Sequence, residues 1–266
     1  MMIDVEPIAF HVDGGARGPL TLRGTKYLPE HFDEHGKAPV ALLFHGFGGN
    51  RIDFSGFIVR LARELAERGI VAVTYDRAGH GESDGEFFDT TVTGDVSDAL
   101  QVAEVVRSLP GCDPNNLHLA GLSLGAVIAT WTAPRLAVQP RSIALCSIAA
   151  SYADEIRGGH LQGRSLSTMD DLGYFDFMGV AMGRAMIDDA TAFDPYKQAR
   201  GFAGYAKFFH GTKDFIPIEY ARHYRDVYGK RMDLLEIEGG DHGFGNVEHR
   251  RIVMQGVGEF IASQAM

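Results

Sequence analysis

The chain has 266 residues, 45% of them apolar and 23% charged, and this length and composition predict one large domain with a substantial core. The formal charge is −10, because 35 Asp and Glu outnumber 25 Lys and Arg, and such a surface repels nucleic acids. No run approaches the roughly 18 apolar residues of a membrane span, and the first residues lack the apolar core of a signal peptide, so we expect a soluble, cytoplasmic protein without a membrane partner.

The N-terminal segment contains two runs in which apolar and polar residues alternate. The runs are Val5–Val12 and Leu20–Leu28, and the segment between them is rich in glycine. Such alternation is typical of strands with one exposed face, and a glycine-rich connection favours a tight turn. The pattern predicts an antiparallel hairpin.

From Val40 onward, short continuous apolar runs alternate with segments of helical periodicity. Continuous apolar runs predict strands that are covered on both faces. The predicted strands are Val40–Phe44, Ile70–Tyr75, Leu117–Ala120, Ile143–Ile148, Ala206–Phe209 and Met232–Ile237. The predicted helices are Phe54–Leu65, Val96–Val106, Leu124–Leu136, Ile218–Tyr228 and Glu248–Ser263. Because parallel neighbours need crossover connections, this alternation predicts an α/β fold with a mostly parallel sheet and helices on both faces.

One long segment, residues 151–196, interrupts the alternation. It separates two predicted strands by more residues than one crossover helix needs, so we interpret it as an insertion within a single domain that covers residues 1–266. The insertion is rich in glycine, methionine and aromatic residues, among them Tyr174 and Met182. It forms either a helical subdomain with its own small core, or a lid whose apolar side chains, including Tyr174 and Met182, face a ligand.

The segment Gly121-Leu122-Ser123-Leu124-Gly125 follows a predicted strand and opens a predicted helix. A serine in this position turns sharply and exposes its oxygen, and the flanking glycines leave room for the turn. The helix also points its N-terminal dipole at this place, where the dipole favours a developing negative charge. We predict that Ser123 is a catalytic nucleophile.

A serine nucleophile needs a histidine base, and the histidine needs a carboxylate that holds its tautomer. Among the 11 histidines, His242 is the best candidate, because its loop follows the last predicted strand and the carboxyl ends of parallel strands converge on one crevice. Asp214, just after the strand Ala206–Phe209, is the predicted carboxylate. Asp241 is the competing choice, although the immediate neighbour of His242 is poorly placed to orient its ring. The order Ser123, Asp214, His242 is the one expected of an α/β-hydrolase.

The segment His45-Gly46-Phe47-Gly48-Gly49 follows the predicted strand Val40–Phe44. A loop in this position supplies one backbone N–H to an oxyanion, and the residue after the nucleophile supplies a second. We predict that these donors are Phe47 and Leu124, and the alternative for the loop is a plain glycine turn. We expect His45 to be a structural hydrogen-bonding residue rather than a base.

Five motifs, in this order, resemble the α/β-hydrolase superfamily. They are His45-Gly46-Phe47-Gly48, Asp76-Arg77-Ala78-Gly79-His80-Gly81-Glu82-Ser83, Gly121-Leu122-Ser123-Leu124-Gly125, His210-Gly211-Thr212-Lys213-Asp214 and Asp241-His242. The resemblance spans nearly the whole chain and implies the α/β-hydrolase fold, whereas a fold does not define a substrate. It also implies that the turn with Asp76, His80 and Ser83 is structural.

Within the superfamily, the sequence is similar to bacterial feruloyl and cinnamoyl esterases. The similarity lies in the His45-Gly46-Phe47 loop, in Ser83-Asp84-Gly85 and in the end of the insertion near Asp194-Pro195-Tyr196. It implies that the insertion binds a hydroxycinnamoyl group through a carboxylate and an amide that reach the phenol hydroxyl. The matching residues are Asp154 and Gln162, and Met182 stands where these esterases often have a tyrosine.

The sequence therefore predicts a serine carboxylesterase that hydrolyses small acyl or aromatic esters through an acyl-enzyme, with a small-molecule ester as its partner. No metal is expected, because the histidines lack metal-ligand spacing, and no cofactor is expected, because no dinucleotide or phosphate-binding motif is present. Two alternatives stay open: cleavage of an amide, thioester or carbon–carbon bond by the same triad, and a low-turnover receptor for a small apolar molecule. The oligomeric state, a homodimer included, is also open.

Overall fold

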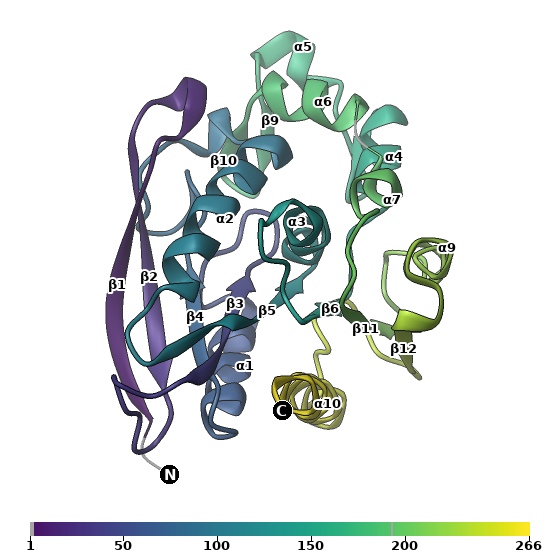
Figure 1. The fold of residues 1–266 in the computed structure, drawn as a ribbon. Coiled ribbons are helices and arrows are strands. Elements are labelled where there is room, and N and C mark those ends of the chain that lie inside the picture. Colours follow the sequence, from purple (N-terminus) through teal and green to yellow (C-terminus); the bar gives the residue numbers. More distant parts are fainter. Residues whose placement is uncertain (1–2, 193) are drawn as a thin grey trace.

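The computed structural model describes residues 3–192 and 194–266, and its centre is an eight-stranded sheet with the order β1-β2-β4-β3-β5-β6-β11-β12 (Figure 1). The strands of this sheet are β1 (Asp4–Val12), β2 (Leu20–Leu28), β3 (Ala38–Phe44), β4 (Val71–Tyr75), β5 (Cys112–Leu122), β6 (Ser142–Cys146), β11 (Tyr205–Gly211) and β12 (Met232–Ile237). Strand β2 pairs antiparallel with β1 and β4, and the other neighbours are parallel. The predicted hairpin and the predicted mostly parallel sheet are confirmed.

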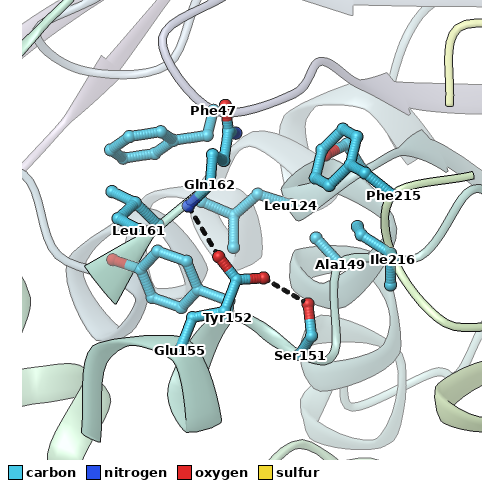
Figure 2. A pocket seen from close by; sticks show the side chains of 11 residues that line it. Phe47, Leu124, Ala149, Ser151, Tyr152, Glu155, Leu161, Gln162, Phe215 and Ile216 are labelled. Carbon is cyan, nitrogen blue, oxygen red and sulfur yellow. Dashed lines mark hydrogen bonds between the residues drawn. The ribbon is translucent and has the colours of Figure 1, made fainter. Parts of the chain in front are cut away.

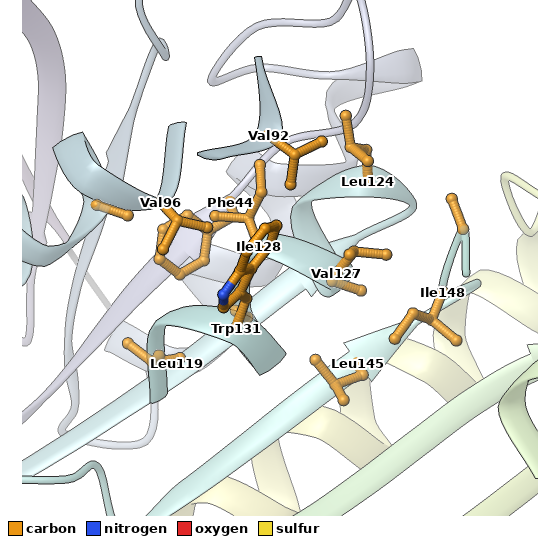
Figure 3. Close-up of a cluster of buried hydrophobic side chains, with 14 of the residues drawn as sticks. Phe44, Val92, Val96, Leu119, Leu124, Val127, Ile128, Trp131, Leu145 and Ile148 are labelled. Carbon is orange, nitrogen blue, oxygen red and sulfur yellow. The ribbon is translucent and has the colours of Figure 1, made fainter. Parts of the chain in front are cut away.

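Helices cover both faces of this sheet (Figure 1). One face carries α2 (Val92–Arg107) and α3 (Leu124–Thr132), and the other carries α1 (Phe57–Ala66) and α10 (Val247–Ala265). Figure 3 shows the first layer, in which Val96 and Ile128 belong to one buried cluster with Phe44 of β3. Because apolar side chains pack on both faces, the central strands are continuous apolar runs. Within the described residues, no helix has the length and apolar character needed to cross a membrane.

One predicted helix, Ile218–Tyr228, is wrong as a single element. The segment forms two short helices, α8 (Glu219–Arg222) and α9 (Arg225–Tyr228). Between them, the N–H of Tyr224 donates to the carbonyl of Ala221 at 3.2 Å, and such i→i−3 bonds wind the chain more tightly than an α-helix. The ring of Tyr224 is fully buried, so packing in the core favours this break.

The insertion connects β6 to β11, which are neighbours in the sheet. Its elements gather at one end of the molecule (Figure 1). They are α4 (Tyr152–Arg157), β7 (His160–Leu161), β8 (Arg164–Ser165), α5 (Thr168–Leu172), β9 (Phe175–Phe177), β10 (Val180–Met182), α6 (Arg184–Thr191) and the start of α7 (Pro195–Gln198). Buried methionines of the insertion, such as Met169 and Met186, join the cluster on the α2–α3 face.

The loops that follow four parallel strands meet at one edge of the sheet. Phe47 follows β3, Ser123 follows β5, Asp214 follows β11 and His242 follows β12. Because the carboxyl ends of parallel strands point the same way, these residues converge on a common crevice. This edge therefore holds the candidate site.

Candidate active site

Ser123 occupies a sharp turn between β5 and α3. Its backbone has φ 58° and ψ −121°, which is a strained conformation for a residue with a side chain. The glycines on either side are required because backbone atoms lie very close to them. A Cβ atom on Gly121 would lie 2.4 Å from the carbonyl oxygen of Gly125, and one on Gly125 would lie 2.3 Å from that of Phe44. The turn that exposes the Ser123 hydroxyl therefore requires both glycines.

Three side chains from separate loops form a hydrogen-bonded chain. Oγ of Ser123 lies 3.0 Å from Nε2 of His242. Nδ1 of His242 lies 2.9 and 3.0 Å from the two carboxylate oxygens of Asp214. When Nδ1–H donates to this carboxylate, Nε2 is left as the acceptor of the Ser123 hydroxyl. The structure thus brings together the three residues selected from the sequence, in a geometry that allows proton transfer from serine to histidine.

The side chain of Asp214 is fully buried. Its Oδ1 also accepts a hydrogen bond of 2.9 Å from the N–H of Ile216. Burial acts to raise the pKa of Asp214, but the hydrogen bond and charge of His242, the Ile216 N–H and the nearby His210 lower this pKa below its usual value. An ionised Asp214 can hold the imidazole in one orientation and stabilise its protonated form.

The competing carboxylate, Asp241, holds its own loop. Its Oδ1 accepts a hydrogen bond of 2.6 Å from the N–H of Gly245, where a Cβ atom would lie 2.6 Å from Oδ2. Across residues 3–192 and 194–266, no hydrogen bond joins Asp241 to the ring of His242. The geometry therefore favours Asp214 as the partner of the histidine.

The backbone N–H groups of Phe47 and Leu124 are available to a ligand. Leu124 is the first residue of α3, and N–H groups in the first turn of a helix have no partner within it. In the described part of the chain, neither of these amides donates to a protein acceptor. Both residues line a hollow beside Ser123, which is the position expected of an oxyanion hole.

Asp53, which belongs to none of the sequence motifs, fixes the loop that carries Phe47. Its carboxylate accepts hydrogen bonds from the N–H of Gly46 at 3.0 Å and from the N–H of Phe54 at 2.6 Å. An Asp directly before a helical pattern is a typical N-cap signal, and this signal could have identified Asp53.

Two hollows adjoin Ser123. The smaller has a volume of about 20 Å³, and its lining includes Leu124, Tyr152 and Leu161 (Figure 2). The larger is an open cleft of about 420 Å³. The residues that line both hollows are Phe47, Ser123, Gln162 and Phe215. The serine therefore lies where one space continues into the other, and the carbonyl of a bound ester can have a substituent in each.

A carboxylate of the insertion lines the smaller hollow. It belongs to Glu155, which accepts hydrogen bonds of 2.7 Å from the hydroxyl of Ser151 and from the N–H of Gln162 (Figure 2). Asp154, the residue selected from the sequence, lines neither hollow and instead accepts a hydrogen bond of 2.9 Å from the hydroxyl of Tyr220. Adjacent helical residues point about 100° apart, so Asp154 and Glu155 cannot face the same space.

Gln162, in contrast to Asp154, lines both hollows. Tyr174 and Met182 line neither: Tyr174 is 37% exposed, and Met182 is fully buried in the insertion. Apart from Gln162, the insertion contributes Phe177 and Met178 to the larger cleft. The expectation that Tyr174 and Met182 face a ligand is therefore not met.

The turn after β4 lies outside both hollows and is held by the buried Asp76. The Asp76 carboxylate accepts from the N–H groups of Arg51 at 2.6 Å and Glu82 at 3.0 Å, and the Ser83 hydroxyl donates to the Asp76 carbonyl at 2.6 Å. Burial lowers the pKa of His80 to about 3, so its ring stays neutral. These contacts suit a structural turn. Among the described residues, no three His, Cys, Asp or Glu side chains gather in a way that could hold a metal ion.

Comparisons with known proteins agree with this architecture. A model of the alpha/beta hydrolase family matches residues 41–255. Among solved structures, the chain is similar to Est1E from Butyrivibrio proteoclasticus with bound ferulic acid, at 24% identity over 97% of this chain and 98% of that chain, with a TM-score of 0.85. It is also similar to the esterase domain of a Rhodothermus marinus protein, at 17% identity over 98% of both chains and a TM-score of 0.69.

A third similar structure is alpha/beta hydrolase domain-containing protein 10 from mouse, at 15% identity over 96% of this chain and 99% of that chain, with a TM-score of 0.74. A comparison with curated protein sequences gives no match. At these identities the solved structures establish a shared fold, whereas the family model covers most of the chain. The chain belongs to the alpha/beta hydrolase family.

Proposed function

We propose that this hydrolase is a serine esterase that cleaves small acyl or aromatic esters through an acyl-enzyme on Ser123. The observation that carries the proposal is the hydrogen-bonded chain from Asp214 through His242 to Ser123. Two unengaged N–H groups, of Phe47 and Leu124, adjoin the same serine. A nucleophile, a base with an oriented tautomer and an oxyanion site are the parts that acyl transfer requires.

In the proposed reaction, Oγ of Ser123 attacks the ester carbonyl while Nε2 of His242 takes the hydroxyl proton. The N–H groups of Phe47 and Leu124 donate to the oxyanion, and the ionised Asp214 stabilises the imidazolium. His242 then gives the proton to the leaving alcohol, and an acyl group stays on Ser123. A water molecule attacks this acyl group with the same base, and the acid and the free serine result.

For the acyl group we propose a short aliphatic or a hydroxycinnamoyl-type group. The larger cleft has about 420 Å³ and aromatic rings from Phe47, Phe177 and Phe215 on its walls, and such a lining suits a planar apolar group. Gln162, which lines this cleft, can donate from its side chain to a phenol oxygen, and the Glu155 carboxylate holds Gln162 in place by accepting from its backbone N–H at 2.7 Å. The ferulic acid bound to Est1E supports this class of ligand.

Substitution of Ser123 by Ala tests the reaction. Ser123→Ala removes one hydroxyl from a small side chain at a turn, so we expect an unchanged circular dichroism spectrum and a loss of ester turnover of about 10⁴-fold or more. Turnover of a chromogenic acetate ester measures the effect, and matched amide and thioester substrates define the bond that is cleaved. A folded alanine variant with wild-type turnover would show that Ser123 is not the nucleophile.

A pair of neighbouring carboxylates tests the acyl preference. Glu155→Gln keeps the volume of the side chain but removes the charge next to Gln162, so turnover of methyl ferulate should fall about tenfold relative to turnover of an acetate ester. Asp154→Asn is the matched control and should change the ratio of the two rates by less than about twofold, because Asp154 lies outside both hollows. Equal losses for both esters in Glu155→Gln would assign this residue to support of the insertion alone.

A further inference from the structure

The carbonyl of the peptide bond between Gly46 and Phe47 has three donors. It accepts hydrogen bonds of 2.7 Å from Nη2 of Arg77, 2.9 Å from Nδ1 of His45 and 3.3 Å from the N–H of Gly49. The preceding peptide is held as well, because the N–H of Gly46 donates to Oδ2 of Asp53 at 3.0 Å. A loop residue with this many fixed contacts has little freedom to rotate.

The orientation of this peptide decides the direction of the Phe47 N–H. In a trans peptide, the C=O and the following N–H point in opposite directions. Because the Gly46 carbonyl points at Arg77, the Phe47 N–H points away from Arg77. The nucleophile is close to this peptide, since a Cβ atom on Gly46 would lie 3.4 Å from Cβ of Ser123 and Phe47 lines both hollows together with Ser123.

We propose that Arg77 is a positioning residue that aims the Phe47 N–H at the oxyanion by holding the carbonyl of Gly46. The inference rests on the proposed esterase function, because it assigns the Phe47 N–H to the oxyanion. A cation on the carbonyl of an amide also polarises that amide and strengthens its N–H as a donor. Arg77 touches neither hollow, so it acts through the peptide and not on the substrate.

Arg77 is buried and is held in place by neighbouring groups. Its side chain is 1% exposed and forms an ion pair with the fully buried Asp95 of α2. The backbone N–H of Arg77 donates to Nε2 of His45 at 3.1 Å, so Nδ1 of His45 carries the proton that binds the Gly46 carbonyl. Burial, together with the nearby Arg77 and His80, lowers the pKa of His45 well below its ordinary value, and the ring stays neutral.

A buried ion pair is by itself a weak source of stability, because removing two charges from water costs about as much as their attraction returns. The ion pair of Arg77 and Asp95 therefore needs another explanation, and the second terminal nitrogen of the guanidinium supplies one. Nη1 binds Asp95, while Nη2 binds the Gly46 carbonyl. The carboxylate on α2 holds the guanidinium, and the guanidinium holds the peptide.

The same helix offers a matched control. Arg17 forms a second ion pair with Asp98 of α2, at 2.8 and 2.9 Å, and their side chains are 15% and 2% exposed. This pair has no contact with Gly46. The double variants Arg77→Met/Asp95→Asn and Arg17→Met/Asp98→Asn each remove one such pair without leaving a buried charge alone, so both are expected to fold.

We expect Arg77→Met/Asp95→Asn to lower kcat for an acetate ester about tenfold to hundredfold, because a misdirected oxyanion donor acts on the transition state. KM should change less than about threefold. A trifluoromethyl ketone forms a hemiketal oxyanion with Ser123. Its inhibition constant should rise by the same factor by which kcat/KM falls. The single variant Arg77→Lys, which returns a cationic donor, should recover part of the loss. The Arg17→Met/Asp98→Asn variant should stay within about threefold of wild type in each measurement.

Equal losses in the two double variants, or a loss confined to KM, would overturn the positioning role. Crystal structures of the two double variants provide a readout that does not need turnover. The Gly46–Phe47 peptide should rotate when Arg77 is replaced and should stay in place when Arg17 is replaced, and an unmoved peptide in the Arg77 variant would also refute the inference. Failure of the proposed function has a different signature, since Ser123→Ala would then keep wild-type ester turnover.

Discussion

Replacement of Asp214 by Asn changes the charge next to His242 with almost no change in volume. Oδ1 of Asp214 accepts from the N–H of Ile216 at 2.9 Å, so the oxygen of the new amide should take this position. Its NH₂ group then takes the position of Oδ2, which lies 3.0 Å from Nδ1 of His242, while the amide oxygen keeps its distance of 2.9 Å from the same atom. The NH₂ group competes as a donor to Nδ1 and so favours the tautomer with the proton on Nε2, the atom that must accept from Ser123. Asp214→Asn should therefore impair proton transfer without opening a cavity.

The size of the effect follows from the interactions that are lost. A hydrogen bond to a charged group contributes about 1.5 to 3 kcal/mol, and we assign a similar cost to the wrong tautomer of His242. The barrier should rise by about 3 to 6 kcal/mol, which corresponds to a decrease in kcat of about 10² to 10⁴-fold. The melting temperature should change little, because the bond from Ile216 is kept.

The assay is kcat for a chromogenic acetate ester, measured beside Asp241→Asn as the matched control. Asp241 is the neighbour of His242 in the chain, but its carboxylate binds the N–H of Gly245. We therefore expect Asp241→Asn to lower kcat by less than about tenfold. If Asp241→Asn were more damaging than Asp214→Asn, the assignment of the acid would be wrong.

Two further predictions concern stability. Gly125→Ala places a Cβ atom 2.3 Å from the carbonyl oxygen of Phe44, so the free energy of unfolding should fall by about 1 to 3 kcal/mol, and an unchanged urea midpoint would contradict the close approach. Burial lowers the pKa of His118 from 6.5 to about 4, so the unfolded chain binds more protons than the folded chain between these two pH values. The contribution of neutral His118 to the free energy of unfolding is therefore complete above pH 6.5 and is lost as the pH falls toward 4. Between pH 7 and pH 5 this one histidine should lower the free energy of unfolding by about 2 kcal/mol. In His118→Gln the free energy of unfolding should depend less steeply on pH, and curves of equal slope for the variant and the wild type would refute the assignment.

The architecture and the three central site residues could be predicted because each depends on a short-range rule. A strand buried on both faces is expected to be a continuous apolar run, and β3, β4, β6 and the part of β5 from Leu117 onward are largely apolar and buried, whereas β5 begins with Cys-Asp-Pro-Asn-Asn. Ser123 lies at a turn that only small neighbours permit. Once the strand order is parallel, the loops that follow β11 and β12 have to meet at the same edge, which is why Asp214 and His242 could be selected without any knowledge of distances.

The residues around a substrate could not be predicted in the same way, because they depend on rotation about a helix axis and on packing within the insertion. Asp154 and Glu155 are neighbours of the same chemical class, and a one-residue difference turns the side chain by about 100°. Met182 satisfies the same apolar pattern whether it faces a ligand or a core. The support of the Gly46 carbonyl by Arg77 joins residues that are 31 positions apart, and no local pattern encodes such a contact.

The position of the insertion has a consequence for how this chain can evolve. Strands β6 and β11 pair directly, from Ser142 with Tyr205 to Cys146 with Phe209, so the chain leaves the sheet and returns to it at adjacent strands. A change in the length of the segment between these strands therefore need not shift the register of the sheet. Ser123, Asp214 and His242 lie outside residues 151–196, whereas Gln162, Phe177 and Met178 of the cleft wall lie within them. A change in this segment can thus alter part of the wall around a ligand while the reacting groups stay the same.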